Sequence, residues 1–291
     1  MTKGLRIDNH RGEHIATLFE PQAPAIGVLV NVPHSGETLS EDVDSLVRDE
    51  GGLRQQMLQD VDRFVDRIWA QAPLTGATLL VATMNRYVVD LNRAPDDISE
   101  QVVEGARERQ GPGYYGERGV VWGCTTRRTP VWKRKLEPEE FEARIARFHA
   151  PYHAAMVDIM SELRTQHGRA ILVDAHSMPS RGRSGHGDEG RPRPDINPGC
   201  LGGVSCDPSI RRGVEEHLRA AGLEVRTDDP YRGGFITRHY GRPSQGWHAI
   251  QIEINRHLYM DEDSCEEKSE AIAALGVTMV GLPAKLSRLQ E

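Results

Sequence analysis

Cysteine and aromatic residues are scarce in this sequence of 291 residues, which has four cysteines and 5% aromatic residues. No two cysteines form a CxxC pair, which argues against a zinc ribbon or a thioredoxin-type redox site. The polar N-terminal segment also lacks the apolar stretch of a secretory signal peptide. Scattered cysteines without a secretory signal are typical of reduced thiols, so we expect a cytoplasmic protein.

Long apolar runs and an excess of positive charge are also absent. No run of 18 apolar residues occurs, so we expect no membrane-spanning segment. The net charge is −7, with acidic and basic residues mixed along the chain, which argues against an extended nucleic-acid surface. The length and the 38% of hydrophobic residues fit a single globular domain, which we expect to span residues 1–291. The sequence does not indicate the oligomeric state.

Short runs rich in β-branched residues alternate with helical patterns. The expected strands are 26–32, 78–84, 87–91, 170–174 and 248–254, with 223–226 as a weaker sixth. Strands that alternate with helices predict crossover connections between parallel strands. We therefore expect an α/β fold in which helices cover both faces of a mixed, largely parallel sheet.

Two apolar stripes predict the main helices. In 53–68, apolar residues recur every three or four positions, and the same pattern returns in 141–163. Pro151 predicts a kink in the second of these helices, and Gly168 predicts its end.

Two long segments lack such patterns. Residues 94–135 and 177–210 are rich in glycine, proline, arginine and aspartate, and their periodicity is weak. Loops of this length inside a compact domain are usually lids or binding loops. We therefore expect both segments to border the functional site.

Polar side chains follow several of the expected strands. They are His34 and Glu37 after 26–32, Asn92 and Arg93 after 87–91, His176 after 170–174, and Glu253 near the end of 248–254. In open α/β sheets, ligands bind in the crevice beyond the carboxyl ends of the strands. We therefore expect two histidines, carboxylates and an arginine to converge in one crevice.

The two histidines predict a metal site. A catalytic zinc ion takes three protein ligands and keeps a fourth position open. His34 and His176 would supply two of these ligands, and a carboxylate would supply the third. Asp174 precedes His176 by two residues, so its carboxylate could orient that imidazole. Sites built from two histidines and a carboxylate also suit iron, manganese or cobalt.

Six segments resemble those of one enzyme family. They are VPHSGE, DVDRFVDRIW, NRYVVDLNR, ILVDAHSMPS, DPYRGGFITRHYGRP and WHAIQIEINRHLYMDE. Together they resemble, in family order, the N-formylglutamate amidohydrolases (N-formylglutamate deformylases), over residues 26–262. The resemblance implies zinc-dependent hydrolysis of N-formyl-L-glutamate to formate and L-glutamate, a step of histidine degradation. It also implies a phosphorylase/hydrolase-like fold similar to that of the zinc carboxypeptidases.

The resemblance makes His34 and His176 zinc ligands and leaves two candidates for the third. The zinc carboxypeptidases, which share an H-x-x-E spacing with this sequence, point to Glu37. The D-x-D motif of the amidohydrolase family points instead to Asp62. That residue lies off the apolar stripe of the first predicted helix, as an exposed surface charge would. A helix that begins near Asp60 would place it in the first turn instead, so both candidates stay open.

Glu253 is the expected catalytic carboxylate. It lies on the polar side of an alternating strand, and glutamate is rarely buried without a partner or a task. As a general base it would take a proton from the attacking water, whose pKa zinc lowers to about 7, and pass it to the leaving amine. A nearby arginine, Arg93, would help to stabilise the oxyanion. The alternatives are an ion pair between Glu253 and an arginine such as Arg256, or simple solvent exposure.

Arginines are expected to bind the anionic substrate, because a planar guanidinium pairs with a carboxylate in a bidentate manner. Arg93 is the first candidate, and Asn92 beside it would donate a further hydrogen bond. The other candidates are Arg86, Arg238, Arg242, Tyr231 and Tyr240. Tyr231 belongs to a glycine-rich run that we expect to form a mobile substrate loop.

Two other functions are compatible with these residues. One is a zinc hydrolase of the same fold that acts on another N-acyl amino acid or on a peptide. The other is a non-catalytic protein that keeps the fold and binds an anionic metabolite through its arginines. The joint presence of His34, His176 and Glu253 makes the binding protein the least favoured of the three functions.

Overall fold

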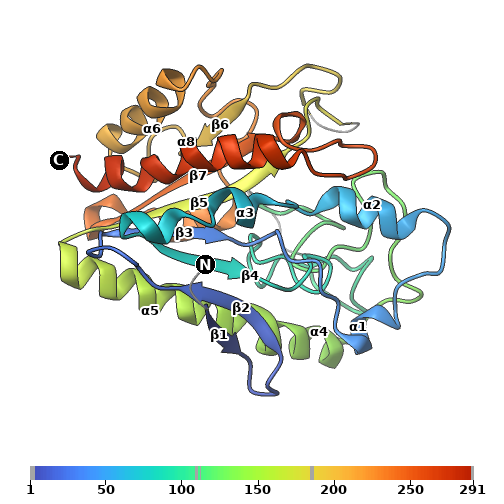
Figure 1. Ribbon diagram of the computed structural model, residues 1–291. Helices are drawn as coiled ribbons and strands as arrows, with labels where there is room; N and C mark the ends of the chain where they lie inside the picture. Colours follow the sequence, from blue (N-terminus) through green and yellow to red (C-terminus); the bar gives the residue numbers. More distant parts are fainter. Residues whose placement is uncertain (1–3, 109–110, 112, 184–186, 290–291) are drawn as a thin grey trace.

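A mixed sheet forms the centre of the protein (Figure 1). The computed structural model describes residues 4–108, 111, 113–183 and 187–289, and within them seven strands make up this sheet. The strands are β1 (Leu5–Asp8), β2 (His14–Phe19), β3 (Val28–Val32), β4 (Thr78–Ala82), β5 (Ala170–Met178), β6 (Ile196–Gly199) and β7 (Trp247–Asn255). Their order is β1-β2-β4-β3-β5-β7-β6. The four central strands are parallel, whereas β1, β2 and β6 run antiparallel to their neighbours. The predicted mixed sheet is confirmed, with its parallel part at the centre.

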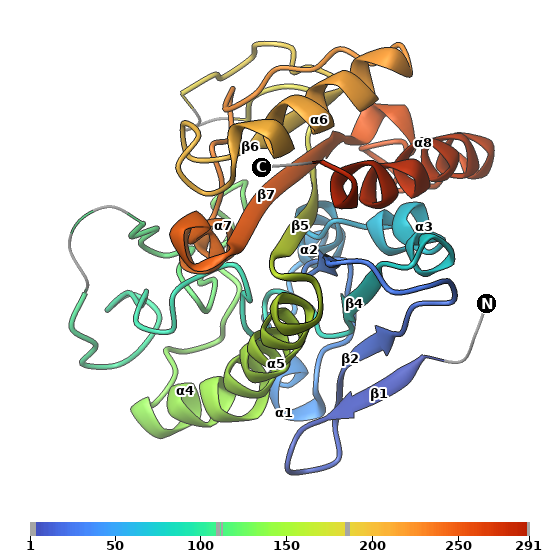
Figure 2. The ribbon, with the colours of Figure 1, turned by 90° about the vertical axis from the view of Figure 1, so that its left-hand side faces the viewer.

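Helices cover both faces of the sheet, as the sequence predicts. The longer helices are α2 (Leu53–Asp60), α4 (Pro138–Arg144), α5 (Ala150–His167), α6 (Pro208–Ala220) and α8 (Ser269–Ser287). The shorter ones are α1 (Glu41–Asp44), α3 (Val65–Trp69), α7 (Phe235–Tyr240), the 3-10 turns η1 (Ala72–Thr75), η3 (Pro243–Gln245) and η4 (Arg256–Leu258), and the π-helical turn η2 (Ile145–His149). Figure 2 shows α5 on one side of the central strands and α3, α6 and α8 on the other.

The central strands are buried on both faces. In β3, Val28, Val30 and Val32 pack into the core beneath α3 and α8, whereas Leu29 packs into the core beneath α5. Complete burial of one such side chain stabilises the fold by about 1.5–3 kcal/mol. A strand buried on both faces reads as an unbroken run of β-branched residues, which is why the sequence predicts β3, β4, β5 and β7 close to their observed bounds.

The first predicted helix, over 53–68, is wrong as a single element. It divides into α2 and α3, and Val61 between them is extended while Phe64 has a positive φ of 66°. The main-chain N–H of Asp62 donates a hydrogen bond of 2.9 Å to the carbonyl oxygen of His34. This contact with a distant part of the chain holds the connection beside the end of β3 and interrupts the helical pattern.

The second predicted helix is confirmed, with a local change in its winding. Helix α4 continues through the π turn η2 into α5, and Gly168 ends the helix in a left-handed conformation with φ 79°. Pro151 has no main-chain N–H to bond to the preceding turn. The wider π turn directly precedes this proline, and π turns inside α-helices are common at functional sites.

Two predicted strands differ from the structure, and three observed strands lack a prediction. Residues 87–91 form a buried set of turns instead of a strand, and the N–H of Val88 bonds to the carbonyl of Asn85. Residues 223–226 contribute a single bridge, from Val225 to Ile196. The edge strands β1, β2 and β6 were not predicted, because they are short and β1 is largely exposed.

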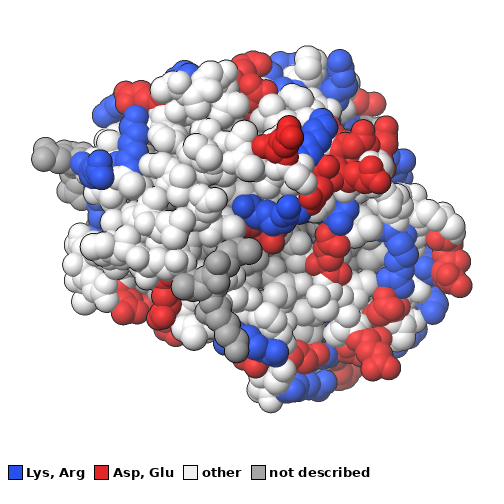
Figure 3. Space-filling model, in the orientation of Figure 1, with Lys and Arg blue, Asp and Glu red and all other residues white. Residues whose placement is uncertain are grey.

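Helix α8, with 19 residues, is long and apolar enough to cross a membrane by length and composition, which corrects the expectation that no segment is. No charged residue lies between Glu270 and Lys285, and uncharged side chains cover most of the surface around the helix in Figure 3. The helix nevertheless packs as a core element, with Leu275, Met279 and Leu282 buried in the core beneath it.

Candidate active site

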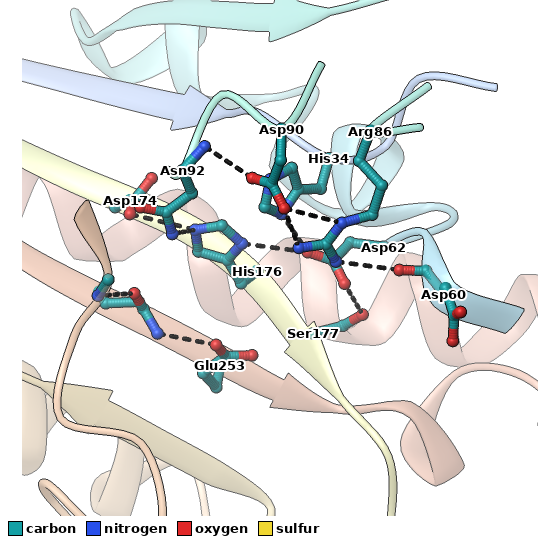
Figure 4. Close-up of polar contacts among 12 residues, drawn as sticks. His34, Asp60, Asp62, Arg86, Asp90, Asn92, Asp174, His176, Ser177 and Glu253 are labelled. Carbon is teal, nitrogen blue, oxygen red and sulfur yellow. Dashed lines mark hydrogen bonds and ion pairs between the residues drawn. The ribbon is translucent and has the colours of Figure 1, made fainter. Parts of the chain in front are cut away.

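Two histidines and one aspartate converge at the carboxyl ends of the central strands. His34 lies just beyond β3, His176 lies in β5, and Asp62 lies between α2 and α3. One ligand atom of each lies within 4.8 Å of the others, and all three side chains are buried. Figure 4 shows this group, in which the Nδ1 atoms of His176 and His34 lie 3.1 and 3.6 Å from Asp62 Oδ2. The structure thus brings together the two predicted histidines and one of the two candidate carboxylates.

A carboxylate lies beside the outer nitrogen of each imidazole. Asp90 Oδ1 lies 2.7 Å from Nε2 of His34, and Asp174 Oδ2 lies 3.0 Å from Nε2 of His176. A carboxylate in this position favours a proton on Nε2 and leaves the Nδ1 lone pair for a metal. The D-x-H spacing predicts the role of Asp174. Asp90 was missed, although it lies in the DLNR segment that also carries Asn92.

Asp62, and not Glu37, occupies the third position of the group. Glu37 accepts a hydrogen bond of 2.6 Å from Arg63 Nε, and its side chain is 42% exposed. The H-x-x-E spacing is therefore a poor guide here, because the chain after His34 turns Glu37 toward the surface. Asp62 lies neither on the exposed face of a helix nor in the first turn of one, the two positions that the sequence suggests. It lies in the connection between α2 and α3.

The second oxygen of Asp62 is held by groups that keep the carboxylate ionised. Asp62 Oδ1 accepts hydrogen bonds from Ser177 Oγ at 2.9 Å and from Arg256 Nη2 at 3.0 Å. Burial opposes the charged form, but the bonds from His176 and His34 and the charge of Arg256 hold the pKa of Asp62 well below its usual range. Two imidazole nitrogens and one ionised carboxylate form a donor set that fits zinc.

Glu253 lies on β7 directly opposite His176 in the parallel register. Its side chain is buried, and Oε1 accepts a hydrogen bond of 2.7 Å from Gln251 Nε2. Burial raises the pKa of Glu253 to about 7, although the nearby charge of His176 acts in the opposite direction. The predicted alternative of an ion pair with Arg256 is wrong, because Arg256 bonds to Asp62. A carboxylate whose pKa is near neutrality is suited to transfer protons in both directions.

A cavity of about 310 Å³ is lined by His34, Asp62, His176 and Glu253. Residues of both long segments line its wall. The segment 94–135 contributes Tyr115, Arg118, Trp122 and Thr126. The segment 177–210 contributes Pro179 and Arg183, together with Ser177 near the end of β5. The cavity is therefore built from segments with little regular secondary structure around a rigid strand-end site.

Most of the predicted substrate-binding residues line this cavity, and one group does not. The residues on the wall are Asn92, Arg93, Arg86 and Tyr231. Arg238 and Arg242 instead line a second cavity of about 220 Å³ beside α7, which shares Tyr115 with the first. Tyr240 is buried and bonds to His153.

Asp90 connects the group of His34, Asp62 and His176 to the aromatic wall of the cavity. Its Oδ2 accepts hydrogen bonds from Arg86 Nη2 at 2.7 Å and from the indole Nε1 of Trp122 at 2.9 Å. Burial raises the pKa of this carboxyl, but the charges of Arg86 and His34 outweigh burial and hold it well below its usual value. Asp90 therefore stays ionised and fixes the orientation of His34.

Two histidines of the helix behind the site hold the loop that carries Asn92. His149 Nε2 and His153 Nε2 each lie 3.0 Å from a carbonyl oxygen, of Arg93 and of Leu91 respectively. These bonds fix the main chain on both sides of Asn92. Burial lowers the pKa of both imidazoles, so they are neutral at neutral pH.

We expect these histidines to make the protein sensitive to acid. Because the folded pKa of His153 lies below its unfolded value of about 6.5, the unfolded chain binds more protons as the pH falls through 6.5. The free energy of unfolding should decrease there, with a slope of up to about 1.4 kcal/mol per pH unit for one group. Urea titrations between pH 7.5 and 5 measure this slope. It should be shallower in His153→Gln and unchanged in His10→Gln, which alters an exposed histidine. Equal slopes in all three proteins would contradict the assignment.

The chain resembles known proteins along most of its length. Residues 26–260 match the sequence profile of N-formylglutamate amidohydrolase. The chain is 33% identical to the N-formylglutamate deformylase of Pseudomonas aeruginosa over 243 residues, 82% of this chain and 84% of that protein. It is 32% identical to that of Pseudomonas putida over 240 residues, 81% of this chain and 82% of that protein.

A solved structure agrees in fold as well as in sequence. The N-formylglutamate amidohydrolase of Ralstonia eutropha JMP134 is 30% identical and superimposes with a TM-score of 0.83, covering 94% of this chain and 97% of that one. The sequence profile covers most of the chain, and the relatives exceed 30% identity over about four fifths of it. The chain therefore belongs to the N-formylglutamate amidohydrolase family.

Proposed function

We propose that this amidohydrolase cleaves N-formyl-L-glutamate to formate and L-glutamate with the help of one divalent metal ion, for which zinc is our first candidate. The observation that supports this most directly is the placement of Glu253 and the buried group of His34, Asp62 and His176 in one cavity. A general base beside a potential metal site is an arrangement suited to the attack of water on an amide. The family supplies the substrate, and the two homologous deformylases support that choice.

The three residues of the buried group would hold the metal. His34 and His176 would bind through Nδ1 and Asp62 through Oδ2, because these atoms face one another. When bound, zinc supplies Lewis acidity, which polarises the formyl carbonyl and lowers the pKa of a water molecule. Asp90 and Asp174 would hold the two imidazoles in the orientation that this binding needs.

Glu253 would carry the proton from the water to the leaving group. Its carboxylate accepts the proton as the water oxygen bonds to the formyl carbon. It then returns the proton to the amide nitrogen as the C–N bond breaks, so that formate and the free amino group of glutamate are released. A pKa of about 7 suits both steps at neutral pH.

Arg93 is the arginine we assign to stabilising the developing negative charge. It is 12% exposed, and its Nε and Nη1 donate to the carbonyl oxygens of Arg118 and Asn92. These bonds fix the guanidinium at the cavity wall, where a preorganised cation stabilises an oxyanion more strongly than it would in water.

Formate release from N-formyl-L-glutamate, measured with purified protein before and after chelation, tests this function. We expect activity that disappears with chelation, returns with zinc, and is accompanied by about one metal ion per chain in elemental analysis. A panel of N-formyl and N-acetyl amino acids should be turned over more slowly than N-formyl-L-glutamate. Full activity in a demonstrably metal-free protein, or faster turnover of another acyl amino acid, would contradict the proposal.

A further inference from the structure

The cavity wall contains more guanidinium groups than carboxylates to neutralise them. Six arginines line it: Arg86, Arg93, Arg118, Arg183, Arg232 and Arg256. Three of the six have a carboxylate of their own. The pairs are Arg86 with Asp90, Arg183 with Asp60 and Arg256 with Asp62, at N–O distances of 2.7, 2.9 and 3.0 Å. Arg93, Arg118 and Arg232 are left for other partners.

Two of the remaining arginines lie together on the aromatic wall. Arg93 approaches Asp90 to 4.0 Å, but that carboxylate already bonds to Arg86. Arg118 is half-buried, and its guanidinium makes no hydrogen bond or ion pair with any residue that the structure describes. It lies 5.7 Å from the ring centroid of Trp122. Burial and the positive charge of neighbouring arginines lower the pKa of Arg118. An anion is therefore the partner that this wall lacks.

Arg232 provides a second cationic group elsewhere on the wall. Within the described part of the chain its guanidinium has neither a hydrogen bond nor an ion pair. Its carbonyl oxygen accepts a hydrogen bond of 2.7 Å from the N–H of Leu201, which lies just beyond β6. The main chain of this exposed arginine is therefore held beside the end of β6.

The sheet order separates these two cationic groups. Arg93 and Arg118 belong with Asp90 and His34, which follows β3. Arg232 belongs to the end of the sheet at β6, and β5 and β7 lie between β3 and β6. His176 on β5 and Glu253 on β7 therefore lie between the two cationic groups.

We propose that Arg118 binds one carboxylate of the substrate and that Arg232 binds the other, so that this site selects N-acyl amino acids with two carboxylates. The inference rests on the proposed function and adds the residues that set its specificity. A guanidinium forms bidentate hydrogen bonds with a carboxylate. A substrate with one carboxylate leaves one of the cationic groups unpaired, and sites that contain unpaired polar groups reject such analogues.

The experiment combines two variants with two analogues. Arg118→Met and Arg232→Met keep most of the apolar stem and remove the charge. For N-formyl-L-glutamate, we expect each variant to raise KM about 10- to 100-fold, as loss of a charge-assisted hydrogen bond does. N-formyl-L-glutamine lacks the side-chain carboxylate, and N-formyl-L-isoglutamine lacks the α-carboxylate. With one of these two analogues, each variant should have the same KM as the original protein, because the carboxylate that its arginine binds is missing. This analogue should differ between the two variants.

Arg127→Met is the matched control, because Arg127 lies in the same loop as Arg118, is exposed and does not line the cavity. It should keep the KM of the original protein for all three compounds. The inference is overturned if Arg118→Met or Arg232→Met keeps the original KM for N-formyl-L-glutamate. It is also overturned if a variant raises KM equally for N-formyl-L-glutamine and N-formyl-L-isoglutamine.

A binding measurement separates this inference from the proposed function. Glutarate is a dicarboxylate that cannot be hydrolysed. Calorimetric titration with it therefore measures how strongly the arginines bind carboxylates, without catalysis. We expect weaker glutarate binding in Arg118→Met and Arg232→Met than in the original protein and in Arg127→Met. That result supports the arginine assignment even if no formate is released from N-formyl-L-glutamate. Equal affinities in all four proteins overturn the assignment even if the deformylase activity is present.

Discussion

Replacing Glu253 with glutamine is expected to lower kcat for formate release by about 10²- to 10⁴-fold, the usual contribution of a positioned general base. The amide has nearly the same shape and can still bond to Gln251, which lies 2.7 Å from the carboxylate. It cannot accept a proton from water at neutral pH. Because Glu253 lies outside the group of His34, Asp62 and His176, the metal content should stay at the level of the original protein, and KM should change little.

The matched control for this prediction is Glu266→Gln, which makes the same chemical change at an exposed glutamate outside the cavity. Its kcat should equal that of the original protein. Steady-state kinetics and elemental analysis on the same preparations give both quantities. If Glu253→Gln kept its kcat, another group would have to be the base. If it lost the metal as well as the activity, its role would be that of a ligand.

The parts of the fold that can be predicted from the sequence are those whose burial is complete. Strands β3, β5 and β7 are covered on both faces and therefore appear as runs of β-branched residues. Residues 87–91 have the same composition and are equally buried, yet they form turns. Their polar main-chain groups bond to loop residues, for example the N–H of Asp90 to the carbonyl of Val120. The composition of a segment predicts that it is buried. It does not predict which groups form hydrogen bonds with its main chain.

The same limit applies to the candidate site. His34, His176 and Glu253 could be identified because each lies at or near the end of a predicted strand, and the fold gathers such positions. The side chains around them depend on contacts that span long distances in the sequence. Asp62 reaches the site because its N–H bonds to the carbonyl of His34, and Asp90 reaches it through a turn. Neither contact leaves a periodic signal in the sequence.

Asp62 should be essential for binding the metal, and replacing it with asparagine tests this most directly. Asparagine has the same shape and keeps an oxygen that can accept bonds from Ser177 and Arg256, which hold the carboxylate in place. It removes the negative charge that faces the two imidazoles. Loss of a partner that merely orients a metal ligand weakens metal binding by about 10- to 100-fold. We therefore expect Asp62→Asn to weaken zinc binding at least about 100-fold and to abolish formate release at stoichiometric zinc.

Glu37→Gln is the decisive counterpart, because it makes the corresponding change at the other carboxylate that the sequence offers. Glu37 bonds to Arg63 at the surface, so this variant should bind zinc and release formate as the original protein does. Competition with a chromogenic chelator gives the zinc affinity of both variants. Urea unfolding of their metal-free forms shows whether the chain still folds, since Arg256 loses the charge of its partner in Asp62→Asn. If Asp62→Asn folded and kept its zinc affinity while Glu37→Gln lost it, the third ligand would be Glu37, and the exposed ion pair with Arg63 would have to open when the metal binds.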